Sequence, residues 1–373
     1  MIKRILMLAA ITGILFSGCA KKEVSWKPGM PLDREQLKIG VLHVSNPPEE
    51  TGGYAYAHEQ GIVMMQRELG LSEENVIRKI NIDDADPAQA ESAMRDCIAA
   101  GARIIIATSW GYMETCEKLA AEFPRVIFAH ASGYKSNDTN FTNYFGRIYQ
   151  ARYLSGIAAG LKTRTGKIGY VAAMGKDSSE VTGGINAFAL GVEKVNPGAR
   201  IFVEVTYSWF DPMGEMNAAR SLINAGCDVI AQHCDTSNPQ IEAAASGVWG
   251  IGYNTDMSVN APEAVITSVL WNWGVYYTAL VRSVLDGSFS ASPYLGSISD
   301  GMVDISSLSA IAAPGTEVII AEERQRLTAG TFDVFEGELE TNDGRRIGEA
   351  GKRFADSEIL GGIDWYYRTV VEE

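Results

Sequence analysis

Strongly apolar runs alternate with amphipathic stretches along most of the chain. "LKIGVLHVS" and "GKIGYVAAM" are apolar enough to be buried strands, and so are "ARIIIAT" and "DVIAQH". The segments between them repeat apolar residues with the period of a helix, over roughly a dozen residues each. Strands that alternate with helices in this way predict an α/β fold of parallel sheets flanked by helices.

One supersecondary pattern occurs twice. In "DADPAQAESAMRDCIAAG", Asp86 is the expected helix N-cap, a proline starts the helix and a glycine ends it. In "WFDPMGEMNAARSLINAG", Asp211 and its neighbours repeat all three features. Two "TGG" segments, at Thr51 and Thr182, each follow a strand and predict two similar turns. The repeat therefore predicts two similar lobes that face each other across a cleft, each offering a glycine turn to a ligand.

These features divide the chain between the lobes. Two of the expected segments form lobe 1 and two form lobe 2: 37–146 and 258–292 for lobe 1, 147–257 and 293–373 for lobe 2. The strands that cross between the lobes should act as a hinge, near residues 145–160, 256–262 and 290–300.

The first residues are typical of an exported lipoprotein. Two basic residues precede "ILMLAAITGILF", which is too short to span a bilayer as a mature helix and suits a signal peptide. The following "SGC" resembles a lipobox, in which Cys19 is lipidated and becomes the mature N-terminus. A cleaved signal with an incidental cysteine is the alternative. We expect a signal peptide at 1–18 and a lipidated polar tether at 19–36, which place the protein at the membrane, facing the periplasm or the cell exterior.

Composition limits the classes of partner. The 373 residues are 46% hydrophobic and 21% charged, as in an ordinary soluble protein, and they suffice for two domains. The net charge is −14 and no basic patch alternates with aromatic residues, so nucleic acid is not an expected partner. Cys227 and Cys234 flank a strand and lie too far apart to pair. A disulfide between Cys97 and Cys116 stays open, although buried free thiols are favoured.

Catalytic and metal chemistry find little support. The histidines fit no metal-ligand spacing such as HExxH, and the chain has no G-x-S-x-G motif. "GYVAAMGKDSS" departs from a P-loop, because five residues separate its glycines and Asp177 occupies the Ser/Thr position. We therefore expect no catalytic residue, no metal and no cofactor.

Aromatic residues gather at the ends of predicted strands, in "SWGYM", "YSWF" and "WNWGVYY". Stacked aromatics with a few carboxylates and amides suit a planar heterocycle, although each single aromatic could instead belong to the core or the hinge. Trp110 and Trp209 are expected to hold the ring, and Tyr54 to line the first-lobe wall. The other candidate ligand-binding residues are Tyr112, Phe210, Trp271, Trp273, Asp235, Asp256, Asn272 and Glu50.

Several blocks, in order along the mature chain, resemble the basic membrane protein family. They include "GGYAYAHEQG", "RYLSGIAAG", "GGINAFALG", "IAQHCDT", "GYNTDM" and "VFEGEL". The resemblance implies a two-lobed fold like that of type I periplasmic binding proteins, in a substrate-binding lipoprotein of an ABC importer. It further implies capture of a purine base or purine nucleoside and its delivery to a membrane permease.

Three residues bear on whether the ligand is a free purine base or a purine nucleoside. "SWGY", "SWFDP" and "NWGVYY" resemble the branch of the family associated with a free base such as adenine, but Tyr54 stands where that branch commonly has a tryptophan. The nucleoside branch has a lysine at the position of Trp271, whereas Asp256 matches the aspartate that contacts ribose in nucleoside binders. The choice stays open, with the base slightly favoured.

We therefore expect a monomeric, membrane-anchored receptor that is not an enzyme. Capture between the two lobes buries the ring between aromatics, and the closed form docks on the permease. One alternative is a nucleoside-acting hydrolase, which would need an acid–base or metal site at the strand ends. Others are a sensor without transport and a transcription regulator, which would need a DNA-binding helix-turn-helix in place of the signal peptide.

Overall fold

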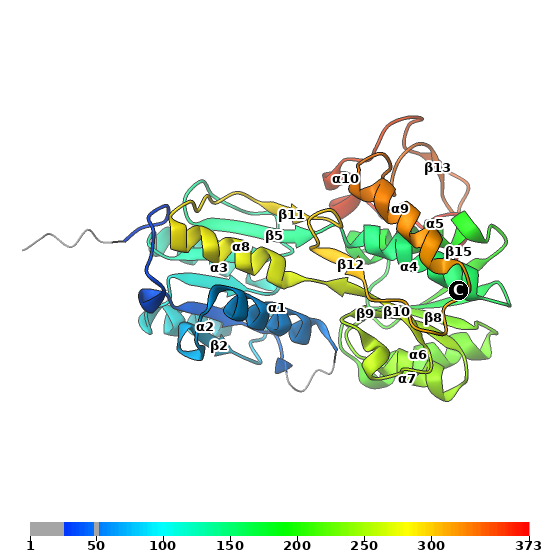
Figure 1. The fold of residues 1–373 in the computed structure, drawn as a ribbon, viewed down its shortest axis with the longest axis horizontal. Helices are drawn as coiled ribbons and strands as arrows, with labels where there is room; N and C mark the ends of the chain where they lie inside the picture. Colours follow the sequence, from blue (N-terminus) through cyan, green and yellow to red (C-terminus); the bar gives the residue numbers. More distant parts are fainter. Residues whose placement is uncertain (1–25, 48–51, 373) are drawn as a thin grey trace, which may run out of the picture.

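The computed structural model describes residues 26–47 and 52–372. Two sheets lie one after the other along the longest axis of the molecule, and helices flank both (Figure 1). The strand order is β11-β5-β4-β3-β1-β2 in the first sheet and β12-β10-β9-β8-β6-β7-β15 in the second. Except for β12, every strand in these sheets runs parallel to its neighbours, so the predicted α/β class is confirmed.

The first lobe is built mainly from the N-terminal part of the chain. Its strands are β1 (Ile39–Leu42), β2 (Val76–Lys79), β3 (Ile104–Ala107), β4 (Ile127–Ala131), β5 (Phe141–Gly146) and β11 (Tyr294–Gly296). Its helices are α1 (Tyr54–Leu69), α2 (Pro87–Ala99), α3 (Met113–Glu122) and α8 (Trp273–Asp286), with short 3₁₀ turns η1 (Arg34–Gln36), η3 (Glu73–Asn75) and η4 (Trp110–Tyr112). Helices α1 and α8 pack against each other, although they are far apart in sequence (Figure 1).

The second lobe contains most of the remaining chain. Its strands are β6 (Lys167–Ala172), β7 (Arg200–Val205), β8 (Val229–His233), β9 (Trp249–Asn254), β10 (Val265–Trp271), β12 (Val303–Ile305) and β15 (Val370–Glu372). Its helices are α4 (Ile148–Lys162), α5 (Ser179–Val195), α6 (Pro212–Asn224), α7 (Asn238–Ala245), α9 (Thr316–Thr328) and α10 (Asp356–Gly361), with the turn η5 (Met257–Val259). A small hairpin pairs β13 (Leu339–Glu340) with β14 (Arg346–Ile347).

The repeated helix start is confirmed in both lobes. The Asp86 carboxylate accepts hydrogen bonds from the first backbone N–H groups of α2, and Asp211 caps α6 through the N–H of Gly214. A proline follows each cap. At this first helical position a backbone N–H would have no partner within the helix, so the missing N–H of proline costs nothing.

The two "TGG" segments are not equivalent, and the prediction of a second turn is wrong. Gly52 has a positive φ of 96° just before α1, where glycine is favoured. Residues 182–184 instead lie inside α5, which already begins at Ser179. A Cβ on Gly184 would come within 2.9 Å of His233 Nδ1. This glycine therefore permits close packing between α5 and β8 rather than a turn.

The chain crosses between the sheets at three places: after Gly146, after Trp271, and between β11 and β12 (Figure 1). The expected hinges at 145–160 and 290–300 contain the first and third crossings. The expected crossing at 256–262 is wrong, because β10 continues the second sheet by pairing with β9. Of the segment 258–292, which was expected in lobe 1, only the part with α8 packs in the first lobe. Strand β11 lies in the segment 293–373, which was expected in lobe 2, but it belongs to the first sheet.

The described part of the predicted tether is ordered against the first lobe. Leu32 is buried, and its N–H donates to the carbonyl of Val284 at the end of α8. Residues 26–36 are therefore part of the lobe. Cys19 and the predicted signal peptide, like Glu50, lie outside the described residues, and none of the described helices is long and apolar enough to cross a membrane.

None of the four cysteines that the structure describes forms a disulfide, and all four are buried, as favoured. Apolar surroundings raise the pKa of Cys97 to about 11, so this thiol stays protonated at neutral pH.

Candidate functional site

An aromatic stack lies where the chain crosses from β10 to α8. Trp273 stacks between Trp271, at a centroid distance of 4.5 Å, and His58 of α1, at 4.2 Å. Tyr54 meets His58 and Trp273 edge-on. The two helices approach closely because glycines face each other: a Cβ on Gly61 would lie 2.7 Å from the backbone of α8. We call His58, Trp273 and Trp271 the aromatic stack.

The second lobe extends this stack with a buried cation and three aromatic side chains. We call the aromatic stack, Tyr54 and four residues of the second lobe the cluster; these four are Arg152, Trp209, His233 and Tyr253. Trp271 Nε1 donates to the Tyr253 hydroxyl at 3.0 Å, and the Arg152 guanidinium lies 4.1 Å from the centre of the Tyr253 ring. His233 meets Tyr253 edge-on at 4.7 Å, and Trp209 meets His233 at 5.8 Å. Cation–π contact and burial together fix the Arg152 side chain between α4 and the second sheet.

Glu180, at the start of α5, faces the same region. Its Oε1 lies 3.7 Å from His233 Nε2. Burial raises the pKa of Glu180 to about 7, while the positive charge of Arg152 opposes this rise. Burial also raises the pKa of Tyr54, with smaller contributions that include the negative charges of Glu180 and Asp235.

The cluster, together with Asn254, contains buried polar atoms that make no hydrogen bond to any described residue: Trp273 Nε1, His58 Nε2, His233 Nε2, Arg152 Nε, Arg152 Nη2 and Asn254 Oδ1. Buried polar groups in proteins are nearly always paired, because an unpaired one costs free energy. So many in one cluster, contributed by both lobes, point to a ligand that supplies the missing partners.

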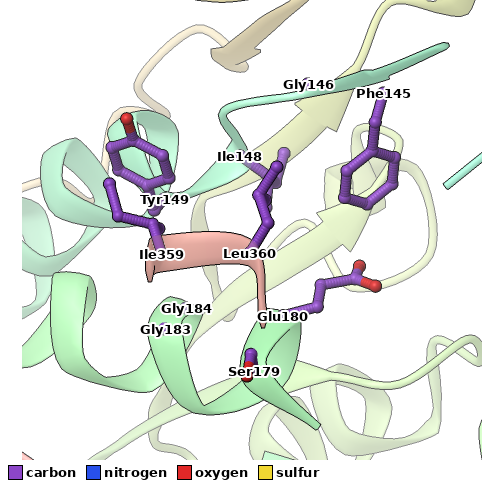
Figure 2. A pocket seen from close by; sticks show the side chains of 10 residues that line it. All are labelled: Phe145, Gly146, Ile148, Tyr149, Ser179, Glu180, Gly183, Gly184, Ile359 and Leu360. Carbon is purple, nitrogen blue, oxygen red and sulfur yellow. The ribbon is translucent and has the colours of Figure 1, made fainter. Parts of the chain in front are cut away.

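The lobes are in contact in this structure. Thr255 Oγ1 of the second lobe donates to the carbonyl of Gly52 at 3.0 Å. The pocket beside Glu180 and Phe145 has a volume of about 10 Å³, the space of roughly one water molecule (Figure 2). This pocket is therefore far smaller than the hundreds of Å³ that ligand pockets usually measure.

Four of the aromatic residues predicted from the sequence lie in the cluster: Tyr54, Trp209, Trp271 and Trp273. Two predicted polar residues lie beside it. Asp235 accepts a hydrogen bond from Asn254 Nδ2, and Asn272 donates to the carbonyl of Gly301. Asn272 therefore ties the second crossing to the loop that carries the third.

The other described candidates lie elsewhere. Tyr112 is fully buried in a separate core of the first lobe and donates to the carbonyl of Ile82. Asp256 is exposed and caps η5 by accepting a hydrogen bond from the N–H of Ser258. Trp110 and Phe210 are 57% and 53% exposed, so neither is packed around the cluster.

Four residues of this region were not predicted from the sequence: His58, Arg152, Glu180 and Tyr253. Arg152 could have been noticed, since it is a charged residue within the otherwise apolar stretch "RYLSGIAAG" and is fully buried. Glu180 carried no comparable signal, because acidic residues are common in the first turn of any helix.

We expect the stability of the ligand-free protein to depend on pH through Glu180. The carboxyl should ionise near pH 4.5 in the unfolded chain but near pH 7 in the folded protein. The folded state thus holds this proton more tightly than the unfolded chain does. The free energy of unfolding should therefore fall as the pH rises from 4.5 to above 7, by at most about 3 kcal/mol. Glu180→Gln should therefore raise the melting temperature more at pH 8 than at pH 5. The same change at both pH values would contradict this expectation.

Comparison with known proteins agrees with this architecture. A family model described as ABC transporter substrate-binding protein PnrA-like matches residues 52–327. A purine-binding protein of Brucella abortus is 33% identical over 362 residues, which cover 97% of each chain. A putative ABC transporter glucose-binding protein of Haloferax volcanii is 31% identical over 311 residues, 83% of this chain and 76% of that protein.

A solved ABC transporter solute-binding protein from Aeropyrum pernix shares the fold, with a TM-score of 0.68 at 18% identity. The match covers 80% of this chain and 92% of that one. The predicted two-lobed periplasmic-binding-protein fold is thus confirmed, as is the resemblance read from the sequence. The chain belongs to the Bmp family, the PnrA-like substrate-binding proteins of ABC transporters.

Proposed function

We propose that the protein captures a purine between its lobes, a free adenine-like base in preference to a nucleoside, and delivers it to an ABC permease. The observation that carries this proposal is the aromatic stack with unpaired N–H groups of both lobes around it. A purine offers a planar face for stacking and ring nitrogens for pairing. The similarity to the Brucella abortus purine-binding protein supports the same ligand class.

In this proposal Tyr54, Trp209 and Trp271 flank the ring. Trp273, whose faces are covered by Trp271 and His58, contributes its unpaired indole N–H, and Asp235 contributes to polar recognition. The receptor acts as a monomer. The ligand stabilises the closed form because it contacts both lobes at once, so binding shifts the population towards closure. The permease then recognises the closed, ligand-bound form.

A sugar is the second candidate ligand, because a relative similar over most of the chain is named as glucose-binding. Aromatic faces also stack on sugar rings, so the stack alone does not separate the two. A nucleoside-acting hydrolase and a sensor without transport are further alternatives.

Native mass spectrometry of the purified protein separates these cases. We expect an added mass that matches a purine, either retained from the host or acquired on incubation with adenine. Binding of glucose with no binding of adenine or adenosine would contradict the proposal. Release of a free base from bound adenosine would instead identify a hydrolase.

We also propose that Cys19 carries lipid and holds the protein at the membrane. The motivation is the charged, apolar and small-residue sequence that ends at Cys19. Cys19→Ser should release the protein into the soluble fraction or leave it unprocessed, as fractionation and intact mass will show. Membrane attachment and mass that stay the same would disprove lipidation.

A further inference from the structure

We infer that Arg152 and Glu180 together read one edge of a purine free base, the edge where the acceptor N3 lies beside the donor N9–H. The inference rests on the proposed purine binding and goes further, because it names the recognised edge and excludes a sugar on N9. Neither residue is an obvious binding residue in the sequence.

The packing of α4 on α5 brings the two side chains to one place. A Cβ on Gly156 of α4 would lie 2.1 Å from the backbone of α5, so these helices are in direct backbone contact there. One turn after Glu180, Gly184 leaves open the space beside Arg152: a Cβ on it would lie 3.6 Å from Arg152 Nε. The start of α5 therefore places its carboxyl group near His233 and, one turn later, a glycine backbone next to both His233 and Arg152.

The Arg152 guanidinium has hydrogen-bond donors that no described residue uses. Its Nη1 donates to the carbonyl of Gln232 at 2.6 Å, and its plane lies over the ring of Tyr253. Its Nε and Nη2 are buried and make no hydrogen bond to any described residue. A buried cation with unused donors is costly, so an acceptor placed here gains more than it would at the surface.

Glu180 supplies the matching acceptor. An ionised carboxylate only accepts hydrogen bonds, and the nearest histidine nitrogen, at 3.7 Å, is too far to donate one. Its raised pKa shows that burial disfavours the charged form, which a ligand N–H would stabilise. The ring N–H of a purine base is more acidic than an exocyclic amine, so it gains more from a charged acceptor. N3, next to it, is an acceptor that suits Arg152.

The surroundings of Glu180 disfavour a sugar on N9. The pocket beside it is walled largely by apolar side chains, among them Phe145, Ile148, Ile359 and Leu360 (Figure 2). These four side chains offer no hydrogen-bond partner to the hydroxyls of a ribose. A nucleoside would therefore lose the N9–H and also leave ribose hydroxyls against apolar walls.

Calorimetric titration with adenine and 9-methyladenine tests the inference, because the methyl group replaces only the N9 proton. The wild-type protein should bind adenine at least about 10-fold more tightly, the typical effect of leaving a partly buried charged group unpaired. Glu180→Ala should lose most of this preference, since it removes the acceptor and opens space for the methyl group. Glu180→Gln, of nearly the same size, should reduce it by less. Glu193→Ala is the matched control, since Glu193 lies on the same helix but pairs with Arg368 away from the cluster.

The outcomes separate the inference from the proposed function. If the wild-type protein binds both bases equally, or if both Glu180 variants keep the full preference, the edge is read by other residues and the inference is wrong although purine binding stands. If the wild-type protein binds neither base nor adenosine, the proposed function itself fails. A Glu180→Ala variant that does not fold leaves the decision to Glu180→Gln.

Discussion

Replacing Trp209 with alanine should weaken purine binding by about 5- to 150-fold, the loss of about 1–3 kcal/mol expected for one aromatic plate that stacks on a base. Trp209 is half-buried and meets His233 within the cluster. Calorimetric titration with adenine measures the effect directly.

Trp110→Ala is the control for this change. Both tryptophans follow a strand of the parallel sheets, but Trp110 is 57% exposed and lies outside the cluster. Its removal should change the affinity by no more than a few-fold. The sequence had instead predicted that Trp110 and Trp209 hold the ring equally. Equal losses in the two variants would show that Trp110 also covers the ligand. If Trp209→Ala instead lowers the melting temperature strongly but leaves adenine binding unchanged, Trp209 is a core residue.

Replacing Phe335 with alanine should lower the free energy of unfolding by about 3–5 kcal/mol, the usual cost of truncating a buried phenylalanine. Phe335 belongs to the C-terminal segment beyond residue 327, where the family match ends. It is fully buried and packs on Tyr149 of α4 at a centroid distance of 5.4 Å. This segment is therefore expected to be an integral part of the second lobe.

Urea denaturation followed by circular dichroism measures this effect. Phe210→Ala is the control, because Phe210 is 53% exposed and its truncation should change stability little. A Phe335→Ala variant as stable as the wild-type protein would mean that the C-terminal segment is only loosely attached and can be removed without loss of the fold.

The elements that could be predicted from the sequence are those specified by local chemistry. Asp86 and Asp211 cap their helices as expected, because an aspartate followed by a proline specifies a helix start whatever surrounds it. The apolar runs became parallel strands because they are buried on both faces. Tyr54, Trp271 and Trp273 were found because they stand at the ends of such runs.

The predictions that were wrong, and the residues that were not predicted, depend on contacts between distant segments. The segment 182–184 resembles the turn at Gly52, but its glycines make room for His233, which only the packing of α5 on β8 reveals. The second crossing was placed too early, because nothing local distinguishes a strand that extends the second sheet from one that returns to the first. Glu180 and Arg152 come from two helices, and their meeting depends on how α4 and α5 pack.

The most direct test of purine capture between the lobes is calorimetric titration of the protein, freed of bound ligand, with adenine at several temperatures. We predict one adenine per chain and a negative heat-capacity change, because closure buries apolar rings of both lobes around the base. The affinity should exceed that for glucose by orders of magnitude. Heat on addition of glucose but none with adenine or adenosine would contradict the account.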